Sequence, residues 1–274
     1  MLDLAIHWNP DPEIFKLGPF SIRYYGLMFV ISFLLGIWIV KKFFKEDKVS
    51  LELVDSLFVW VAIATILGAR LGEVFFYSWD SFKGEPWKIF FPVEFHPFRI
   101  IGFQGLASHG AAIAIPLTLI WFKYKKLPEK SILWLLDRIA IPVALAGLFI
   151  RLGNLFNSEI IGKYTGSNFG FVFERLGDTE PRYPTQLFEG IGYLIVFIIL
   201  WFTYWKTDKK YKEGYIFGLF MVLLWSVRFI VEFWKEPQVA ERADWALNTG
   251  QWLSIPLILL GLFFVFRKTS RKKA

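Results

Sequence analysis

The chain has 274 residues, of which 55% are hydrophobic and 20% aromatic, and its mean hydropathy is +0.45. This composition is too apolar for an ordinary soluble domain and indicates an integral membrane protein with several spanning helices. The formal net charge of +7 is explained by basic loops at a membrane surface, so no nucleic-acid partner is expected.

Cysteine is absent from the chain, and only three histidines are present. The absence of cysteine excludes a disulfide, a thiolate metal site and a cysteine nucleophile within the protein. Three scattered histidines give no basis for a multi-histidine metal site. We therefore expect neither a metal nor a cofactor.

Seven stretches of the chain have the length and apolar character of a spanning helix, which needs about 20 residues. They are residues 21–40, 53–77, 105–124, 132–150, 188–205, 215–233 and 251–266. The sequence therefore predicts an all-α integral membrane protein, a seven-transmembrane helix bundle that forms a single domain over residues 1–274.

Lysine and arginine predict the orientation of this bundle, because cytoplasmic loops carry an excess of both. They gather after the first, third, fifth and seventh spans, at residues 41–48, 123–130, 206–212 and 267–273. The N-terminus is then outside, the C-terminus is cytoplasmic, and the longer loops face outward. Among these loops, residues 163–182 form either a small outward-facing headpiece or a mobile solvated loop, and the sequence leaves both open.

Polar side chains mark the predicted outward ends of the spans, where ionisable groups are costly and usually functional. They are Arg70, His109, Arg151, Gln186, Glu189, Arg228 and Glu232. Arg228 and Glu232 are four residues apart on one helix face, so they are expected to pair. Because the predicted outward ends lie on one side of the membrane, these groups are expected to meet in one cavity.

These residue types suit a phosphate, which guanidinium groups bind through two hydrogen bonds while keeping their charge. Arg70-Leu71-Gly72 echoes Arg151-Leu152-Gly153, and two such turns would clamp an anion from two directions. The alternative is that Arg70 reaches toward lipid headgroups. His109 is suited to moving a proton near neutral pH, although a capping or interfacial role is also open.

The stretch Arg151-Leu152-Gly153-Asn154-Leu155-Phe156-Asn157-Ser158-Glu159-Ile160-Ile161-Gly162 resembles the signature of the bacterial prolipoprotein diacylglyceryl transferase family. Further matches follow in the family's order along the chain. They are Arg23-Tyr24-Tyr25-Gly26-Leu27-Met28, Gly68-Ala69-Arg70-Leu71-Gly72, Leu106-Ala107-Ser108-His109-Gly110, Tyr183-Pro184-Thr185-Gln186-Leu187-Phe188-Glu189 and Arg228-Phe229-Ile230-Val231-Glu232.

The resemblance implies a multi-pass enzyme of the bacterial inner membrane. Such an enzyme transfers the diacylglyceryl group of phosphatidylglycerol to the lipobox cysteine of a prolipoprotein signal peptide, which yields a thioether and glycerol phosphate. Its partners are these two substrates and membrane lipids. Because the nucleophilic thiol arrives with the substrate, an enzyme without cysteine lacks nothing.

The resemblance also implies roles for individual residues. A substrate thiol with a pKa of about 8.5 needs a base at neutral pH, and His109 matches the family's proposed base. Arg151 and Arg228 match essential arginines, and Tyr25 matches a required tyrosine; these four are the predicted catalytic residues. The predicted substrate-binding residues are Arg70, Asn154, Asn157, Glu159, Gly162, Gln186, Glu189 and Glu232, with Glu159 and Glu232 better suited to holding the arginines.

The chain departs from the family pattern at several positions, among them Tyr183, where the family commonly has histidine. The alternative function is a multi-pass anion transporter lined by Arg70, Arg151 and Arg228. Only Asp137-Arg138 continues such a path toward the predicted cytoplasmic ends of the same helices, and no pair of broken helices suggests an inverted repeat.

Overall fold

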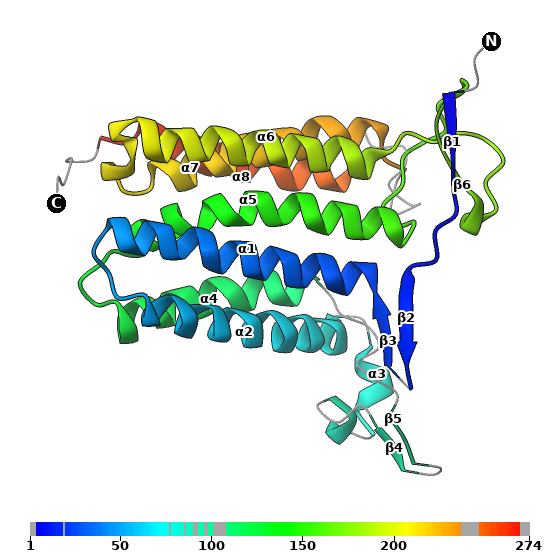
Figure 1. Ribbon diagram of the computed structural model, residues 1–274, viewed down its shortest axis with the longest axis horizontal. Helices are drawn as coiled ribbons and strands as arrows, with labels where there is room; N and C mark the ends of the chain where they lie inside the picture. Colours follow the sequence, from blue (N-terminus) through cyan, green and yellow to red (C-terminus); the bar gives the residue numbers. More distant parts are fainter. Residues whose placement is uncertain are drawn as a thin grey trace. The chain divides into compact units, whose positions relative to one another are not determined.

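The computed structural model of the chain is shown in Figure 1. It describes residues 4–18, 20–76, 78–84, 86–89, 93–95, 98–100, 108–236 and 247–268. The chain divides into two compact units, which are described one at a time. Unit 1 comprises residues 1–40 and 136–274, and unit 2 comprises residues 41–135.

Long helices make up most of both units. They are α1 (Tyr24–Glu46), α2 (Glu52–Phe76), α4 (Ser108–Lys126), α5 (Ile132–Phe156), α6 (Thr185–Lys206), α7 (Tyr215–Val231) and α8 (Thr249–Phe266). The shorter helices are α3 (Trp79–Phe82) and the 3₁₀ turns η1 (Pro86–Ile89), η2 (Glu174–Leu176), η3 (Asp208–Tyr211) and η4 (Glu232–Trp234).

Three short strand pairs accompany the helices. In unit 1, β1 (Leu4–Trp8) pairs in parallel with β6 (Phe169–Phe173), and β2 (Glu13–Leu17) pairs antiparallel with β3 (Phe20–Arg23). In unit 2, β4 (Val93–Phe95) and β5 (Phe98–Ile100) form an antiparallel pair. The predicted first span therefore begins in a strand, and its helix starts at Tyr24.

Six helices of the described chain are long and apolar enough to cross a membrane: α1, α2, α5, α6, α7 and α8. The remaining predicted span, residues 105–124, corresponds to α4, which has 19 residues. Helix α4 opens with Ser108 and His109 and carries three lysines in its last turn, and these residues lower its apolar character. The prediction of an integral membrane protein is thus supported by six spans, and the seventh stays a prediction.

Glycine allows close helix packing in unit 2. A Cβ atom at Gly110 of α4 would overlap the carbonyl oxygen of Gly68 and lie 2.7 Å from the Cα atom of Gly72. Small residues at such a crossing let two backbones touch, which is a common way for helices to associate in membranes. This contact places the start of α4 against α2 at the level of Arg70.

Helices α6, α7 and α8 of unit 1 lie side by side (Figure 1). Gly218 of α7 meets Gly261 of α8, where an added Cβ would lie 2.8 Å from the carbonyl oxygen of Gly261. Gly192 of α6 leaves room for Val227 of α7. Because successive helices run in opposite directions, the C-terminal end of α7 lies beside the N-terminal ends of α6 and α8.

The loop from 163 to 182 folds onto the N-terminal strand. Trp8 of β1 packs against Phe156 and Phe171, with ring centroids 5.6 and 5.5 Å away, and its indole nitrogen donates to the carbonyl oxygen of Leu155 at 2.9 Å. Together with Phe173, these residues form a small apolar core. Of the two alternatives that the sequence leaves open, the structure supports the folded headpiece.

Arg182 stabilises this headpiece through several side-chain contacts. Its guanidinium group binds both carboxylate oxygens of Asp178, at 2.7 and 3.0 Å, and one oxygen of Glu236 at 2.9 Å. It also lies 3.8 Å from the ring centroid of Tyr164. The Tyr164 hydroxyl donates to Asp178, and this hydrogen bond raises the pKa of the tyrosine.

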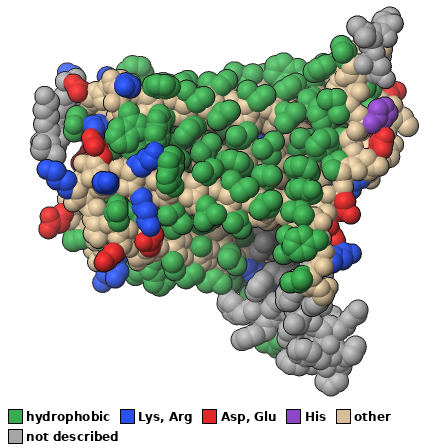
Figure 2. Space-filling model, viewed as in Figure 1, with side chains coloured by type: hydrophobic (Ala, Val, Ile, Leu, Met, Phe, Trp, Pro, Cys, Tyr) green, Lys and Arg blue, Asp and Glu red, His purple; other side chains and the backbone are tan. Residues whose placement is uncertain are grey.

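Figure 2 shows hydrophobic side chains over the visible face of the long helices and basic residues at the helix ends. On α6 the exposed apolar residues include Ile191, Ile195 and Phe202. The segment that connects α6 to α7 is rich in lysine, with Lys206, Lys209, Lys210 and Lys212. An apolar belt that ends in lysines is the pattern expected of helices in a bilayer.

Gly110→Ala tests the α2–α4 contact. The added methyl group has no room beside Gly68, so we expect a loss of about 1–3 kcal/mol of stability, as for other overpacked sites. The measurement is the thermal unfolding midpoint of the detergent-purified protein. The control is Gly84→Ala, since a Cβ at Gly84 meets no atom within 4 Å. Equal midpoints for the two variants would contradict this packing.

Candidate active site

The candidate site lies at one end of unit 1, where five elements meet. They are the start of α1, the last turns of α5, the first turns of α6, the end of α7 with η4, and the start of α8. Since neighbouring helices run in opposite directions, C-terminal and N-terminal ends meet here, and the polar side chains of both gather without entering the middle of the apolar belt.

The chain reverses its direction at the end of α5, within the signature stretch of residues 151–162. Helix α5 continues past the predicted boundary at 150 to Phe156, so Arg151 and Asn154 lie inside the helix. The amide of Ser158 then donates to the carbonyl of Leu155, and the amide of Glu159 to that of Asn154. This is a Schellman ending, with Ser158 at φ 54° in the position that usually holds glycine.

This ending fixes the Glu159 carboxylate. Because the chain reverses after Ser158, the Glu159 carboxylate accepts from the side-chain amide of Asn154 at 2.7 Å and from that of Asn157 at 3.3 Å. Asn154 in turn accepts from Arg151 at 3.1 Å. Glu159 therefore acts on Arg151 through Asn154, which agrees with its expected holding role.

The first turn of α6 supports the same segment. Gln186 donates to the carbonyl oxygen of Glu159 at 2.9 Å, and Thr185 donates to that of Ile160 at 3.0 Å. Ile160 is a β-branched residue at φ 58°, a conformation that costs of order 1–3 kcal/mol and persists only when its surroundings hold it. These two hydrogen bonds hold it.

A chain of buried charges crosses the site. Arg151 of α5 pairs with Glu189 of α6 at 2.5 Å, Glu189 pairs with Lys235 at 2.8 Å, and Lys235 pairs with Glu232 at 2.9 Å. The exposed fractions are 8% for Arg151, 0% for Glu189, 3% for Lys235 and 7% for Glu232. Removing one member of such a buried pair typically costs about 3–5 kcal/mol, since it leaves a charge uncompensated.

The start of α8 closes this chain of charges. A Cβ atom at Gly250 would lie 2.5 Å from the carboxyl carbon of Glu232, so only glycine lets that carboxylate approach the helix. The N-terminal end of a helix also favours a negative charge. Asn248 caps α8 together with Gln251, and its amide donates to the carbonyl oxygen of Glu232 at 3.1 Å.

Arg228 does not pair with Glu232 as the sequence predicted. Within the described part of the chain, Arg228 forms no ion pair, and its nearest aromatic partner is Trp225, at 5.9 Å from the ring centroid. The prediction from the four-residue spacing was wrong because Lys235, three residues from Glu232 on the other side, takes that carboxylate. Among the described residues of unit 1, the guanidinium of Arg228 therefore has no carboxylate partner.

Tyr25 joins the site through a close contact with the signature. Its ring lies against Gly153, where a Cβ atom would be 2.7 Å from the tyrosine Cδ2. The charges of Glu159 and Arg151 act on its hydroxyl. Gly162 is also required by packing, because an added Cβ would overlap the carbonyl oxygen of Tyr183. A role of Gly162 in substrate binding stays a prediction.

Two predicted site residues belong to unit 2. The Arg70 side chain is buried, donates from Nε to the carbonyl oxygen of Ile89 at 3.0 Å and lies 4.9 Å from the ring centroid of Phe82. These contacts hold the segment after α2, and a role of Arg70 in headgroup binding stays a prediction. The backbone of His109 lies in the first turn of α4, while its side chain is outside the described part of the structure.

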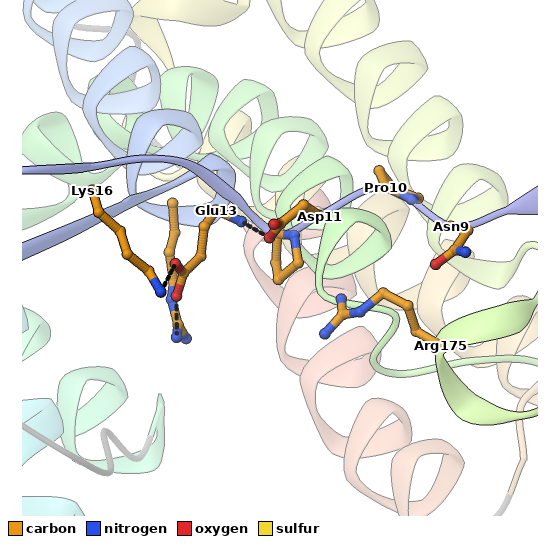
Figure 3. A pocket seen from close by; sticks show the side chains of 8 residues that line it. Asn9, Pro10, Asp11, Glu13, Lys16 and Arg175 are labelled. Atoms are coloured by element: carbon orange, nitrogen blue, oxygen red, sulfur yellow. Dashed lines mark hydrogen bonds and ion pairs between the residues drawn. The ribbon is translucent and has the colours of Figure 1, made fainter.

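A separate open cleft of about 550 Å³ lies between the N-terminal strands and the headpiece of unit 1 (Figure 3). Its charged lining residues are Asp11, Glu13, Lys16, Arg23 and Arg175. Glu13 is paired with Lys16 at 3.4 Å and with Arg23 at 3.2 Å. None of the predicted site residues lines this cleft, so it is not the meeting point of the signature side chains.

Sequence reasoning missed two buried members of the site. Lys235 lies just beyond the predicted sixth span and resembled an ordinary loop lysine. Tyr193, one turn beyond Glu189 on α6, covers Gly147 and lies beside Arg151. A signal for Tyr193 was available, since residues 186, 189 and 193 share one face of a helix. For Lys235 the local signal was its three-residue spacing from Glu232, whereas its second partner, Glu189, is distant in the sequence.

The chain is similar in sequence to a family of known proteins. Residues 12–267 match the family model described as prolipoprotein diacylglyceryl transferase. A relative from Bacteroides fragilis is 40% identical over 96% of this chain and 95% of its own length. One from Tolumonas auensis is 39% identical over 97% and 99%, and one from Chloroherpeton thalassium 40% over 97% and 95%. All three are named phosphatidylglycerol–prolipoprotein diacylglyceryl transferase. The chain therefore belongs to the prolipoprotein diacylglyceryl transferase family.

Proposed function

We propose that this chain is a phosphatidylglycerol–prolipoprotein diacylglyceryl transferase of the bacterial inner membrane. The substrate thiol, from the lipobox cysteine of a prolipoprotein, loses its proton to a base. Its sulfur then forms a bond to the glyceryl carbon that carries the phosphate, while the bond from that carbon to oxygen breaks. The electron pair leaves with glycerol phosphate, and the product is a thioether-linked lipid.

The charge arrangement of unit 1 is the observation that carries this proposal. Arg151 and Lys235 are matched by Glu189 and Glu232, while Arg228 retains a net positive charge among the residues described. An uncompensated guanidinium at the end of an apolar bundle suits the phosphate of an anionic phospholipid. As the leaving phosphate gains charge, this fixed cation would stabilise the transition state more than the ground state.

The other site residues take supporting roles in the proposal. Arg151 is a weaker candidate than Arg228 for binding the phosphate, because its guanidinium already forms an ion pair with Glu189 and a hydrogen bond with Asn154. Asn154 and Asn157 have amide groups that both donate and accept, which suits glycerol hydroxyls or the lipobox backbone. Tyr25 presents a hydroxyl beside the signature. His109 is proposed as the proton acceptor on the resemblance alone, and substitution by glutamine with unchanged turnover would remove it from the mechanism.

The proposed topology places seven spans in the membrane, with the N-terminus outside. In unit 1 the candidate site and the lysines at 206–212 lie at opposite ends of α6. Because lysines favour the cytoplasmic side, the site would face outward, where the lipobox of an exported prolipoprotein emerges. The headpiece of β1 and β6 would then cover the outer end of α5.

Asp137 and Arg138, the pair that would continue an anion path toward the predicted cytoplasmic ends, have structural roles. Asp137 accepts from the backbone amides of Gly214 and Phe217, at 2.7 and 2.8 Å, and so caps α7 from a neighbouring helix. Arg138 lies 5.7 Å from the ring centroid of Tyr204. Both residues are buried. Because these contacts explain why the two residues are there, they give no support to an anion path.

Diacylglyceryl transfer from phosphatidylglycerol to a synthetic lipobox peptide tests the proposal directly. Wild-type protein should add the mass of one diacylglyceryl group to the peptide. Arg228→Gln and Arg151→Ala should each lower kcat/KM by about 100-fold or more, as for lost transition-state cations. Arg175→Gln, which removes an exposed arginine, is the control. If folded wild-type protein left the peptide unmodified, anion transport would become the leading proposal.

Gly153→Ala tests whether the placement of Tyr25 matters. The added methyl group would displace the tyrosine ring, so we expect a loss of at least tenfold in turnover, similar to that of Tyr25→Phe. Gly26→Ala is the matched control, because a Cβ there meets no atom within 4 Å. A fully active Gly153→Ala protein would show that the position of the Tyr25 ring is irrelevant to turnover.

Asp137→Ala separates a structural role from a functional one. Loss of two backbone hydrogen bonds at the start of α7 should lower the free energy of unfolding by about 1–3 kcal/mol. The transfer rate per folded molecule should stay near the wild-type rate. Asp208→Ala removes an exposed aspartate from η3, which precedes α7, and should change neither quantity. A stable but inactive Asp137→Ala protein would contradict this assignment.

A further inference from the structure

Lys235 is buried, and its ammonium group is bound by two carboxylates. Only 3% of the residue is exposed, and its Nζ atom donates to Glu189 at 2.8 Å and to Glu232 at 2.9 Å. A buried lysine with one carboxylate would be an ordinary ion pair. Lys235 instead joins two carboxylates from different elements, Glu189 of α6 and Glu232 of η4.

The backbone holds Lys235 in this position from the other side. Residue 235 forms an antiparallel bridge with Gly162, the last residue of the signature stretch. The amide of Lys163 donates to the carbonyl of Trp234 at 2.8 Å, and the amide of Glu236 donates to that of Ile161 at 3.2 Å. These bonds join the signature to the segment after α7, so the ammonium group is held between its partners.

The charges of the ion-paired chain can be counted around this lysine. Arg151 and Lys235 contribute two positive charges, and Glu189 and Glu232 contribute two negative charges. Glu159 lies outside this chain, where its carboxylate accepts from the amides of Asn154 and Asn157. Arg228 is the remaining cation among the described residues of this cluster. Without Lys235, Glu232 would lose its partner at a position four residues from Arg228, a spacing at which opposite charges on a helix pair readily.

We propose that Lys235 is a positioning residue that keeps Glu232 away from Arg228 and so preserves the positive charge of Arg228 for the anionic headgroup of the lipid substrate. This inference rests on the proposed function for the identity of the lipid, and on the ion pairs of unit 1 for the mechanism. Lys235 does not touch the reacting atoms; it acts through the two glutamates.

Three variants of the full-length protein test this role. Lys235→Met removes the charge at similar volume, Lys235→Arg keeps it, and Lys235→Met combined with Glu232→Gln removes the lysine together with the carboxylate that would neutralise Arg228. The control is Lys163→Met on the paired segment, whose exposed ammonium group donates to the carbonyl oxygen of Phe233 at 3.1 Å.

The measurements are the apparent KM for phosphatidylglycerol and kcat in mixed micelles, together with the thermal midpoint. Lys235→Met should raise the KM by at least tenfold, and the double variant should recover part of this loss, with a KM clearly below that of Lys235→Met. Lys235→Arg and Lys163→Met should stay near wild type. A KM unchanged in Lys235→Met, or a folded double variant as impaired as the single variant, would overturn the proposal.

Direct lipid binding separates this inference from the reaction itself. Native mass spectrometry should detect phosphatidylglycerol bound in preference to zwitterionic phosphatidylethanolamine by the wild-type protein, and this preference should be lost in Lys235→Met and regained in the double variant. A wild-type protein with this preference but no transfer would refute the proposed reaction and leave the role of Lys235 standing. Preserved preference in Lys235→Met would refute the role of Lys235.

Discussion

The buried carboxylate of Glu189 is the group on which the site depends. It has no solvent exposure and joins Arg151 of α5 to Lys235 beyond α7. An isolated carboxylate at this depth would be costly, whereas two cations at hydrogen-bonding distance compensate for its desolvation. Three separate stretches of chain must therefore be in place before the charge is tolerated, and this requirement couples the fold of unit 1 to the geometry of the site.

Local backbone features bring the partners of Glu189 to it. Glycines at 147, 190 and 192 let α6 approach its neighbours closely, which brings Glu189 to Arg151. The Schellman ending of α5 reverses the chain, and the short ladder between 161–163 and 234–236 then carries Lys235 inward. Two cations are then paired and Arg228 has no ion pair among the described residues, and the proposed binding of an anionic lipid rests on this arrangement.

Hydropathy predicted the helices well, because a spanning helix needs a long apolar stretch whatever its neighbours are. It failed at the ends: β3 occupies the predicted start of the first span, and α5 extends beyond 150, since strands and helix endings depend on hydrogen bonds that hydropathy does not register. Ser158 gave no warning of a left-handed ending because glycine is the usual signal there.

The predicted site residues of unit 1 do gather at one end of the bundle, yet their pairing differs from the expectation. Spacing along one helix suggested that Arg228 and Glu232 pair. The actual partner, Lys235, also meets Glu189 from α6, and a cation shared by two buried carboxylates prevails over a single pair. Such choices depend on tertiary packing, which spacing alone does not contain. The side chain of His109 lies outside the described residues, so its role stays a prediction.

An experimental structure of the protein with phosphatidylglycerol bound tests the central claim most directly. The lipid phosphate should lie within hydrogen-bonding distance of the Arg228 guanidinium, with Arg151 still paired to Glu189 and Lys235 still between Glu189 and Glu232. A phosphate bound away from Arg228, or an Arg228 paired with Glu232 beside the bound lipid, would contradict it.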